Sequence, residues 1–392
     1  MSTEQRNTRT ALLTPFNVIA AIIVVAGLVI TVMRFTMGLG SVTNLSANNP
    51  WGLWISFDLL CGVALAAGGY TTSTACYIFG YKRFHGAVRP AILTAFLGYA
   101  LVVLALHYDV GRPWRLVYPI FYQQGTTSVL FEVGLCVFIY LTVLFLEFLP
   151  AALEWWGGFD RLRNVLVKLT MGLTILGVIL STLHQSSLGA LYLIAPSKLH
   201  PLWYTPYLPL MFFLSSMFAG LSMVIFEGTL SHRSLHHLMD EEYNAGYEDL
   251  HFAFAKGASW IMAGYLAMKL IGLAMDNHWS YLATGYGAWW LFEVVGFVLL
   301  PCYCYAVGYR DRNLALIRVA APWTVLGIIL NRFDVGLVAF NWRLPSADRY
   351  FPSFSEIVIS LFVVTVGVLA FRFIATHMPI FYVHPHYKDA SH

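Results

Sequence analysis

The sequence predicts an all-α polytopic membrane protein with about ten transmembrane helices. Of its 392 residues, 58% are hydrophobic and only 11% are charged, whereas an average soluble domain has about 25% charged residues. A helix needs about 20 apolar residues to cross the hydrocarbon layer, and irregular backbone cannot face lipid. Apolar stretches of that length recur along the whole chain. We therefore exclude a water-soluble globule, and the short connections leave no room for a separate catalytic domain.

The first stretch, 12–33, is predicted to be a retained helix. It follows Arg6 and Arg9 as a signal peptide would, but its apolar part is about twice the usual length of a signal h-region and no A-x-A site follows it. Nine further stretches are predicted to span the membrane: 54–79, 91–108, 129–149, 165–183, 209–230, 252–275, 288–307, 314–330 and 357–374. The stretch 314–330 is the shortest of the ten.

The distribution of Lys and Arg predicts the orientation, because basic residues stay on the cytoplasmic side. With the N-terminus inside, 15 basic residues lie in cytoplasmic segments and helix ends, seven lie at the opposite face, and Lys269 lies within a helix. We expect a multi-pass protein of the bacterial inner membrane with both termini in the cytoplasm. This bias accounts for the net charge of +3, so the charge indicates no nucleic-acid partner.

The cysteines and histidines do not form a recognisable metal motif. The five cysteines have no C-x-x-C spacing, which excludes a ferredoxin motif within this chain. We expect them to be small buried apolar residues. The predicted cytoplasmic loop from His232 to Glu242 contains histidines and acids without a repeated ligand spacing, so we interpret it as a solvated connector. No metal site is predicted.

Ionisable groups within a bilayer cost several kcal/mol unless they are paired or hydrated, so each is a functional candidate. In the predicted topology, seven helices bring such groups to one layer near the periplasmic surface. The layer contains Asp58, Asp109, Arg112, Glu132, His184, Glu293, Arg332, Asp334 and Glu356.

Four members of this layer are predicted to handle protons: His184, Asp58, Asp109 and Glu132. A histidine that titrates near neutrality can exchange a proton with a substrate carbonyl. Beside His184, Gln185, Ser186 and Ser187 offer more polar groups than a buried core tolerates without partners. A buried pair that fixes helix packing is an equally weighted alternative for Asp58 and Glu132.

Further residues of the layer are predicted to bind the substrate: His184, Gln185, Ser186, Arg112, Trp54 and Arg332. Asp109 and Arg112 are three residues apart, which favours an ion pair on one helix face, and for Arg112 this structural role is the preferred interpretation.

A second, smaller polar group is predicted nearer the cytoplasm: Glu147, Glu227, Arg318 and, deeper, Lys269. Snorkelling to the interface explains most of these residues. Alternatively, Glu227 and Lys269 could begin a proton path toward the periplasmic layer. The predicted periplasmic loops are rich in aromatic residues, Pro, Gly and Asn, as in Asn49-Pro-Trp-Gly-Leu-Trp54. Such loops can pack on a partner protein or form an interfacial aromatic belt.

Short segments in order along the chain resemble those of the NrfD/polysulfide-reductase family of membrane subunits, and are most similar to subunits of the hydrogenase-2 and high-molecular-weight cytochrome types. The segments are Gly38-Leu-Gly-Ser-Val42, Pro50-Trp-Gly-Leu-Trp-Ile-Ser-Phe-Asp58, Asp109-Val-Gly-Arg112, Ser128-Val-Leu-Phe-Glu132, His184-Gln-Ser-Ser-Leu-Gly189, His200-Pro-Leu-Trp203, Ile225-Phe-Glu-Gly228, Val338-Ala-Phe-Asn341 and Tyr350-Phe-Pro352.

The resemblance implies one integral membrane domain, 1–392, with two four-helix bundles (54–183 and 209–330) and flanking helices (12–33 and 357–374). It implies the quinone-reactive membrane subunit of a menaquinone oxidoreductase complex of anaerobic respiration, with menaquinone as bound substrate, no haem and no redox cluster of its own. The implied partners are a ferredoxin-like iron–sulfur subunit on the periplasmic face and a periplasmic multihaem cytochrome c or [NiFe] hydrogenase; other membrane subunits are possible.

Two other functions remain open from the sequence. A haem b carrier needs two facing histidines, and His107 and His184 are the candidates at helix depth. A secondary transporter is the second alternative, although transporters gather polar residues at the midplane and most charges of this chain avoid it.

Overall fold

The computed structural model describes residues 14–81 and 84–382, and this part of the chain is helical without strands. It contains ten helices that are long and apolar enough to cross a membrane, as predicted. They are Pro15–Met37, Trp54–Ile78, His85–Asp109, Val129–Trp156, Asp160–Leu193, Leu208–Leu238, Gly246–Met275, Gly285–Arg310, Leu314–Val338 and Phe354–His377. The protein is therefore a multi-pass membrane protein. Of the predicted first helix, the start at residue 12 lies outside the described residues, as do Arg6 and Arg9.

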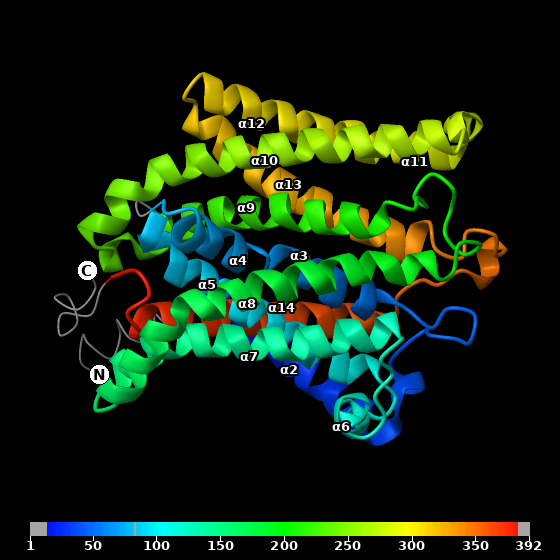
Figure 1. The fold of residues 1–392 in the computed structure, drawn as a ribbon. Helices are drawn as coiled ribbons and strands as arrows, with labels where there is room; N and C mark the ends of the chain where they lie inside the picture. The colour runs from blue at the N-terminus through cyan, green and yellow to red at the C-terminus, as the bar shows by residue number, and fades with distance from the viewer. Residues whose placement is uncertain (1–13, 82–83, 383–392) are drawn as a thin grey trace.

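The helices run side by side along one axis, so the molecule has two ends (Figure 1). We call one the loop end; it carries the connections 38–53, 110–128, 194–207, 276–284 and 339–353. The other is the terminal end, where α2 (Pro15–Met37) begins and α14 (Phe354–His377) ends. The loop end is the face predicted to be periplasmic.

Capping side chains explain where several helices begin. Ser128 caps α7 (Val129–Trp156) and Asp240 caps α10 (Glu241–Met275), each by accepting a backbone N–H of the first turn. Ser353 and Glu356 form a capping box at the start of α14. Between α7 and α8 (Asp160–Leu193), Gly157 has φ of 76°, a conformation that favours glycine and allows a tight reversal.

The second span is interrupted. It consists of a π-helical turn η2 (Trp54–Leu59), short helices α3 (Leu60–Leu65) and α4 (Gly68–Ser73), and a second π-helical turn η3 (Thr74–Ile78). Small residues of this span lie in close contact with the next helix. A Cβ atom on Gly62 would lie 2.6 Å from Val102 Cγ2, and one on Gly69 would lie 2.5 Å from Ala95 Cβ, both on α5 (His85–Asp109).

The ninth span is longer than predicted. Helix α13 (Leu314–Phe333) continues without a break into the π-helical turn η9 (Asp334–Val338), which adds a polar turn that hydropathy alone does not recognise. The eighth span is likewise α11 (Gly285–Val294), π-helical η8 (Val295–Leu299) and α12 (Leu300–Arg310). Each interruption widens the helix locally, as π-turns do at many functional sites.

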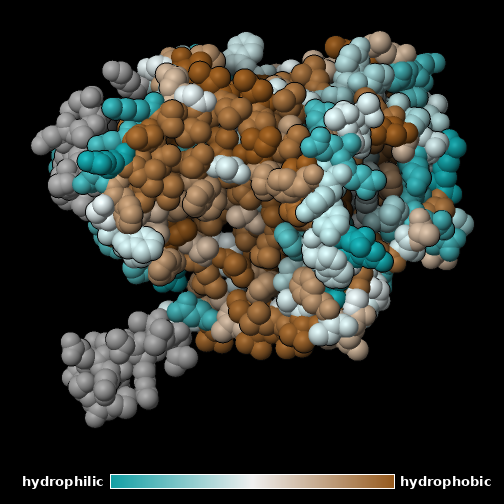
Figure 2. Space-filling view, turned by 60° about the horizontal axis from the view of Figure 1, so that its bottom comes forward, coloured by the Kyte–Doolittle hydropathy of each residue, from teal (hydrophilic) through white to brown (hydrophobic). Residues whose placement is uncertain are grey.

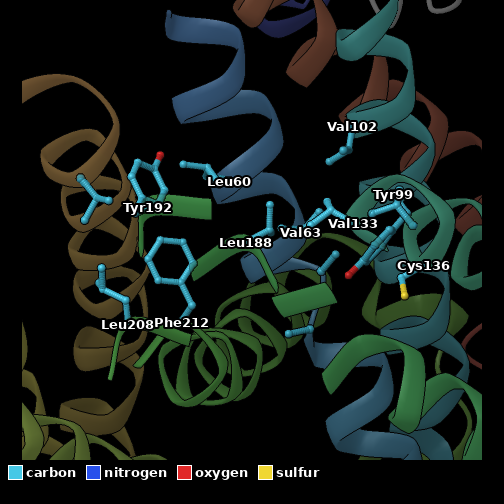
Figure 3. Close-up of a cluster of buried hydrophobic side chains, with 14 of the residues drawn as sticks. Leu60, Val63, Tyr99, Val102, Val133, Cys136, Leu188, Tyr192, Leu208 and Phe212 are labelled. Carbon is cyan, nitrogen blue, oxygen red and sulfur yellow. The ribbon is translucent and has the colours of Figure 1, made fainter. Parts of the chain in front are cut away.

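Two groups of helices pack around the central α9 (Leu208–Leu235). On one side α7 packs on α8 and α5, and on the other α10 packs on α9 and α12, with α13 on α9 and α12. Apolar side chains from α3, α5, α7, α8 and α9 form a continuous core where the first group meets α9; Figure 3 shows part of it. Helices α2 and α14 pack on each other, and α14 contacts α5. The division into two four-helix bundles stays a prediction.

The surface has the character expected of a membrane protein. Figure 2 shows a broad hydrophobic face between hydrophilic regions at the two ends. Side chains such as Ile22, Leu130 and Val319 are each more than half exposed although they are apolar. In a bilayer such side chains face lipid.

Candidate functional site

A groove of about 930 Å³ lies near the loop end, between η2, α11, η9 and α14. Its walls are mostly apolar and aromatic, with Phe57 and Phe333 stacked on each other at a ring separation of 5.8 Å. Trp289, Leu361 and Val364 line it and remain exposed on the apolar surface. The groove therefore opens sideways, toward the region that lipid occupies. Its size and lining are typical of a site for a small apolar ligand.

Few polar groups reach the groove. Ser360 and Tyr350 present hydroxyl groups to it, Trp289 presents an indole, and Arg349 lies at its loop-end margin. The Arg349 guanidinium donates hydrogen bonds to the carbonyl oxygens of Leu344 and Trp342, at 3.0 and 2.8 Å. The indole of Trp289 donates to Asp334 Oδ1 at 2.7 Å.

The predicted site residue Asp58 lies directly behind one groove hydroxyl. Asp58 belongs to η2, and its side chain is buried. Ser360 Oγ donates a hydrogen bond of 2.6 Å to Asp58 Oδ2, while Asp58 Oδ1 is buried without a hydrogen-bond partner in the described part of the chain. A hydroxyl between an open groove and a carboxylate with a spare oxygen is an arrangement that can exchange protons.

Asp109 lies behind Asp58, at the end of α5, and interacts electrostatically with Asp58, Glu356 and Arg34. The predicted ion pair between Asp109 and Arg112 is wrong, since the ion pairs found among the described residues do not include it and Arg112 is exposed. The helix ends at Asp109 and Val110 is extended, so the three-residue spacing no longer places the two side chains on one face. Instead Arg34 of α2 lies nearby, donating to the carbonyl oxygens of Tyr108 and Val110.

The second predicted group, around His184, is enclosed between α5, α7 and α8. His184 Nδ1 hydrogen-bonds the Leu180 carbonyl at 2.8 Å, so it must carry the ring proton, and Nε2 accepts a hydrogen bond from the Tyr99 hydroxyl. Gln185 Nε2 donates to the Val63 carbonyl at 2.9 Å, and Ser187 donates to Glu132 Oε1 at 2.7 Å. The structure thus brings these predicted residues together, but none of them lines the groove.

The remaining predicted residues are spread over the loop-end half. Ser186 is half-buried on α8 beside Gln185. Trp54 is buried and its indole donates to the Glu356 carbonyl at 3.1 Å. Arg332 is buried in the second group of helices, where it donates to Asn331 Oδ1 and Ser215 Oγ and lies 3.9 Å from the centre of the Phe212 ring.

A buried ion pair that the sequence did not indicate joins Lys269 and Glu293, with Nζ 2.6 Å from Oε1. The indole of Trp203 and the amide of Asn331 also donate to Glu293, each at 2.8 Å. The expectation that Lys269 snorkels toward the cytoplasm is therefore wrong, whereas a proton path that includes Glu227 and Lys269 stays a prediction. Lys269 lies in the last turns of α10, near the loop end, whereas Glu227 hydrogen-bonds Thr94.

Sequence reasoning placed Glu356 and Asp334 in the polar layer, but it missed Ser360 and Tyr350 as groove residues. A serine four residues after Glu356, within an otherwise apolar span, is the signal that could have found Ser360. Among residues 14–81 and 84–382 no group of three or more His, Cys, Asp or Glu side chains is arranged to hold a metal ion.

Comparison with known proteins gives a consistent set of similarities. The profile of the polysulphide reductase family NrfD matches residues 41–339. A protein of Nitratidesulfovibrio vulgaris is 63% identical over 387 residues, covering 99% of this chain and 100% of the relative. The probable Ni/Fe-hydrogenase 2 b-type cytochrome subunit of Escherichia coli is 35% identical, covering 93% of this chain and 92% of the relative. The menaquinone reductase integral membrane subunit of N. vulgaris is 27% identical, covering 88% of this chain and 86% of the relative.

Proposed function

Because the chain belongs to the polysulphide reductase NrfD family, whose members are membrane subunits of quinone-linked reductase complexes, we propose that it exchanges electrons between menaquinone and a periplasmic redox module. The module would be an iron–sulfur subunit with a cytochrome c or a hydrogenase. One relative is named as a menaquinone reductase subunit and another as a hydrogenase subunit, which supports both halves of the proposal.

The observation that carries the proposal is the groove that opens toward lipid and has the Ser360–Asp58 pair on its inner wall. A quinone is an apolar ring with two carbonyl oxygens and a long apolar tail. Its ring fits among the aromatic side chains of the groove, such as Phe57 and Trp289, while its tail remains among lipid chains. Because Ser360 donates its own proton to Asp58, its oxygen would then accept a hydrogen bond from one O–H group of a bound quinol.

The proton chemistry follows from the same contact. When a quinol is oxidised, its hydroxyl gives a proton to Ser360 Oγ while Ser360 gives its own proton to Asp58 Oδ2, across the observed 2.6 Å bond. The two electrons leave to the redox partner, and quinone reduction reverses each step. Asp109, at the loop-end terminus of α5, interacts electrostatically with Asp58 and would take the proton on, while the nearby Arg34 guanidinium supplies a fixed positive charge. His184 and Glu132 are proposed as proton carriers within the neighbouring helices, since they do not line the groove.

We further propose that the loop end faces the periplasm across a bacterial inner membrane and that both termini are cytoplasmic. The bias of basic residues toward the other end supports this orientation. A redox partner docked on the loop end would lie close to the groove, which is lined in part by the loop residues Arg349, Tyr350 and Phe351. Electron transfer requires that proximity.

The chain is proposed to work without haem. Bis-histidine ligation would need a free ring nitrogen on both His107 and His184. His184 Nδ1 is bonded to Leu180 and Nε2 to Tyr99, so ligation through Nε2 would require the buried contact with Tyr99 to break. A haem b band in the reduced-minus-oxidised spectrum of the purified subunit would overturn this part of the proposal.

Blocking the groove tests the proposal. Leu361→Trp fills the groove from α14, and Val368→Trp places the same side chain on the exposed surface of α14 outside the groove. We expect Leu361→Trp to weaken binding of a naphthoquinone analogue to the intact complex by at least about tenfold, or 1.4 kcal/mol. Val368→Trp should leave binding unchanged. Equal binding by both variants would refute the groove as the quinone site.

A further inference from the structure

A second hydroxyl of the groove is also backed by a buried carboxylate. Tyr350 lines the groove, and its hydroxyl donates a hydrogen bond to Glu356 Oε1. The Glu356 side chain is 1% exposed. The groove lining therefore contributes one residue to each of two such pairs, Ser360–Asp58 and Tyr350–Glu356. Tyr350 Oη also accepts the backbone N–H of Leu53 at 2.9 Å.

The Glu356 carboxyl group is the acceptor in each of its described hydrogen bonds. Besides the Tyr350 hydroxyl, it accepts the backbone N–H groups of Ser353 and Asn44 at Oε2, at 2.8 and 3.1 Å. All its described partners are donors, which suits an acceptor-only group. Burial and the hydrogen bond to Glu356 raise the pKa of Tyr350. The Tyr350 hydroxyl therefore gives up its proton only when it receives another proton at the same time.

The two pairs are neighbours along α14. Glu356 and Ser360 are four residues apart on α14, and so are separated by about 6 Å along the helix axis. Both carboxylates, Asp58 and Glu356, interact electrostatically with Asp109. Two proton acceptors on one wall of the groove thus share a route past one acid toward the loop end.

We propose that Tyr350 and Glu356 form the second proton-exchanging pair of the groove, acting on the quinone oxygen that Ser360 and Asp58 do not reach. This inference rests on the proposed function, because it assigns a role within the same groove. In quinol oxidation the second O–H bond breaks, its proton passes to Tyr350 Oη, and the Tyr350 proton passes to Glu356 Oε1. The two electrons of the quinol go to the iron–sulfur class of partner, and reduction runs in reverse.

Two variants separate this role from a structural one. Tyr350→Phe keeps the ring but removes the hydroxyl. Glu356→Gln keeps an oxygen that accepts the Ser353 N–H, so the capping box at the start of α14 is preserved, but an amide cannot take up the proton. The control is Tyr305→Phe, which removes a buried hydroxyl bonded to Ser222 at 2.7 Å, in the second group of helices and outside the groove lining.

The measurement is steady-state electron transfer between reduced dimethylnaphthoquinone and the intact complex that contains each variant. We expect Tyr350→Phe and Glu356→Gln to lower kcat by at least about 100-fold, as for loss of a general acid–base group, with KM near the wild-type value. Tyr305→Phe should keep the wild-type kcat. A rise in KM with unchanged kcat in both variants would mean that the pair only binds the ring, and would overturn the inference.

Asp58→Asn, measured alongside, keeps the two proposals apart. If Asp58→Asn lowers kcat while Tyr350→Phe and Glu356→Gln turn over normally, the second pair is refuted and the groove remains. If all three variants turn over normally, the groove itself is not the site of quinone chemistry, and both proposals fail.

Discussion

The loop-end half of the molecule buries charge in two different ways. In the second group of helices, Lys269 and Glu293 neutralise each other, and both oxygens of Glu293 have donors. At the groove, Asp58 has one hydroxyl on Oδ2 and no partner on Oδ1 in the described part of the chain. A carboxylate that is neutralised by a buried cation holds helices together, whereas a carboxylate that accepts a hydroxyl of a groove residue and has no cation in the described ion pairs can take up that hydroxyl's proton. Asp58 and Glu293 both lie in the loop-end part of their spans, so their partners distinguish them.

The largest expected effect is on the compensated pair. Lys269→Met leaves Glu293 charged and buried without its cation, which should lower the free energy of unfolding by about 3–5 kcal/mol. Thermal unfolding of the purified protein measures the loss. The double variant Lys269→Met/Glu293→Leu removes both charges and should recover most of the stability. If the single variant is as stable as wild type, the pair does not have the structural role given to it here.

Asp58→Asn should produce the converse result at the groove. The amide still accepts the Ser360 hydroxyl but cannot take its proton, so quinone turnover should fall by about 100-fold or more. The melting temperature should stay near that of wild type. If Asp58→Asn is as destabilised as Lys269→Met and its folded fraction turns over normally, Asp58 has a structural role like that of the Lys269–Glu293 pair.

His184 is expected to contribute both to stability, like the Lys269–Glu293 pair, and to turnover, like Asp58. It is fully enclosed and bonded at both nitrogens, so His184→Ala leaves the buried Tyr99 hydroxyl without a partner. We expect a loss of about 1–3 kcal/mol in unfolding free energy and a smaller fall in turnover than for Asp58→Asn. Both quantities can be measured on the same preparation. If His184→Ala instead loses as much turnover as Asp58→Asn and keeps the wild-type stability, His184 exchanges protons with the substrate like Asp58.

The smallest expected effect concerns a buried base outside the membrane spans. Burial and the nearby His278 lower the pKa of His200 to about 4, whereas an unfolded histidine titrates near 6.5. The folded state therefore resists protonation, so its stability is complete above about pH 6.5 and declines as the pH falls toward 4. Comparing melting temperatures at about pH 7 and about pH 5 should show a larger drop for wild type than for His200→Phe. Equal drops would assign the pH dependence to other groups.

The fold could be predicted from the sequence because a membrane span needs only length and apolar composition. All ten spans are found, and the boundaries differ mainly where polar turns extend a helix beyond the apolar core, as at Asp334–Val338. The polar layer near the loop end could also be predicted, because charged residues are rare in membrane-spanning segments and therefore easy to recognise. Asp58 and His184 do lie on buried faces, whereas Glu132 is exposed in the first turn of α7, where it accepts a hydrogen bond from Ser187.

The groove could not be predicted, because it depends on how helices are rotated and packed. Asp58 and Ser360 are 302 residues apart in the chain, and no local pattern indicates that α14 turns this serine toward η2. The predicted pairing of Asp109 with Arg112 failed for a related reason, since the helix ends at Asp109 and the chain up to Arg112 is no longer helical. Lys269 and Glu293 form an ion pair between α10 and α11, and residue spacing within a single helix cannot predict such a contact.

The sideways opening of the groove determines how its substrate is supplied. A molecule that enters from between lipid chains reaches the site by diffusion in two dimensions, and the relevant concentration is its mole fraction in the membrane. Acyl chains that touch Leu361 and Val364 are then the competitors for the same space. An apparent KM expressed per volume of buffer would change whenever the amount of lipid changes, even with the same protein and the same amount of quinone.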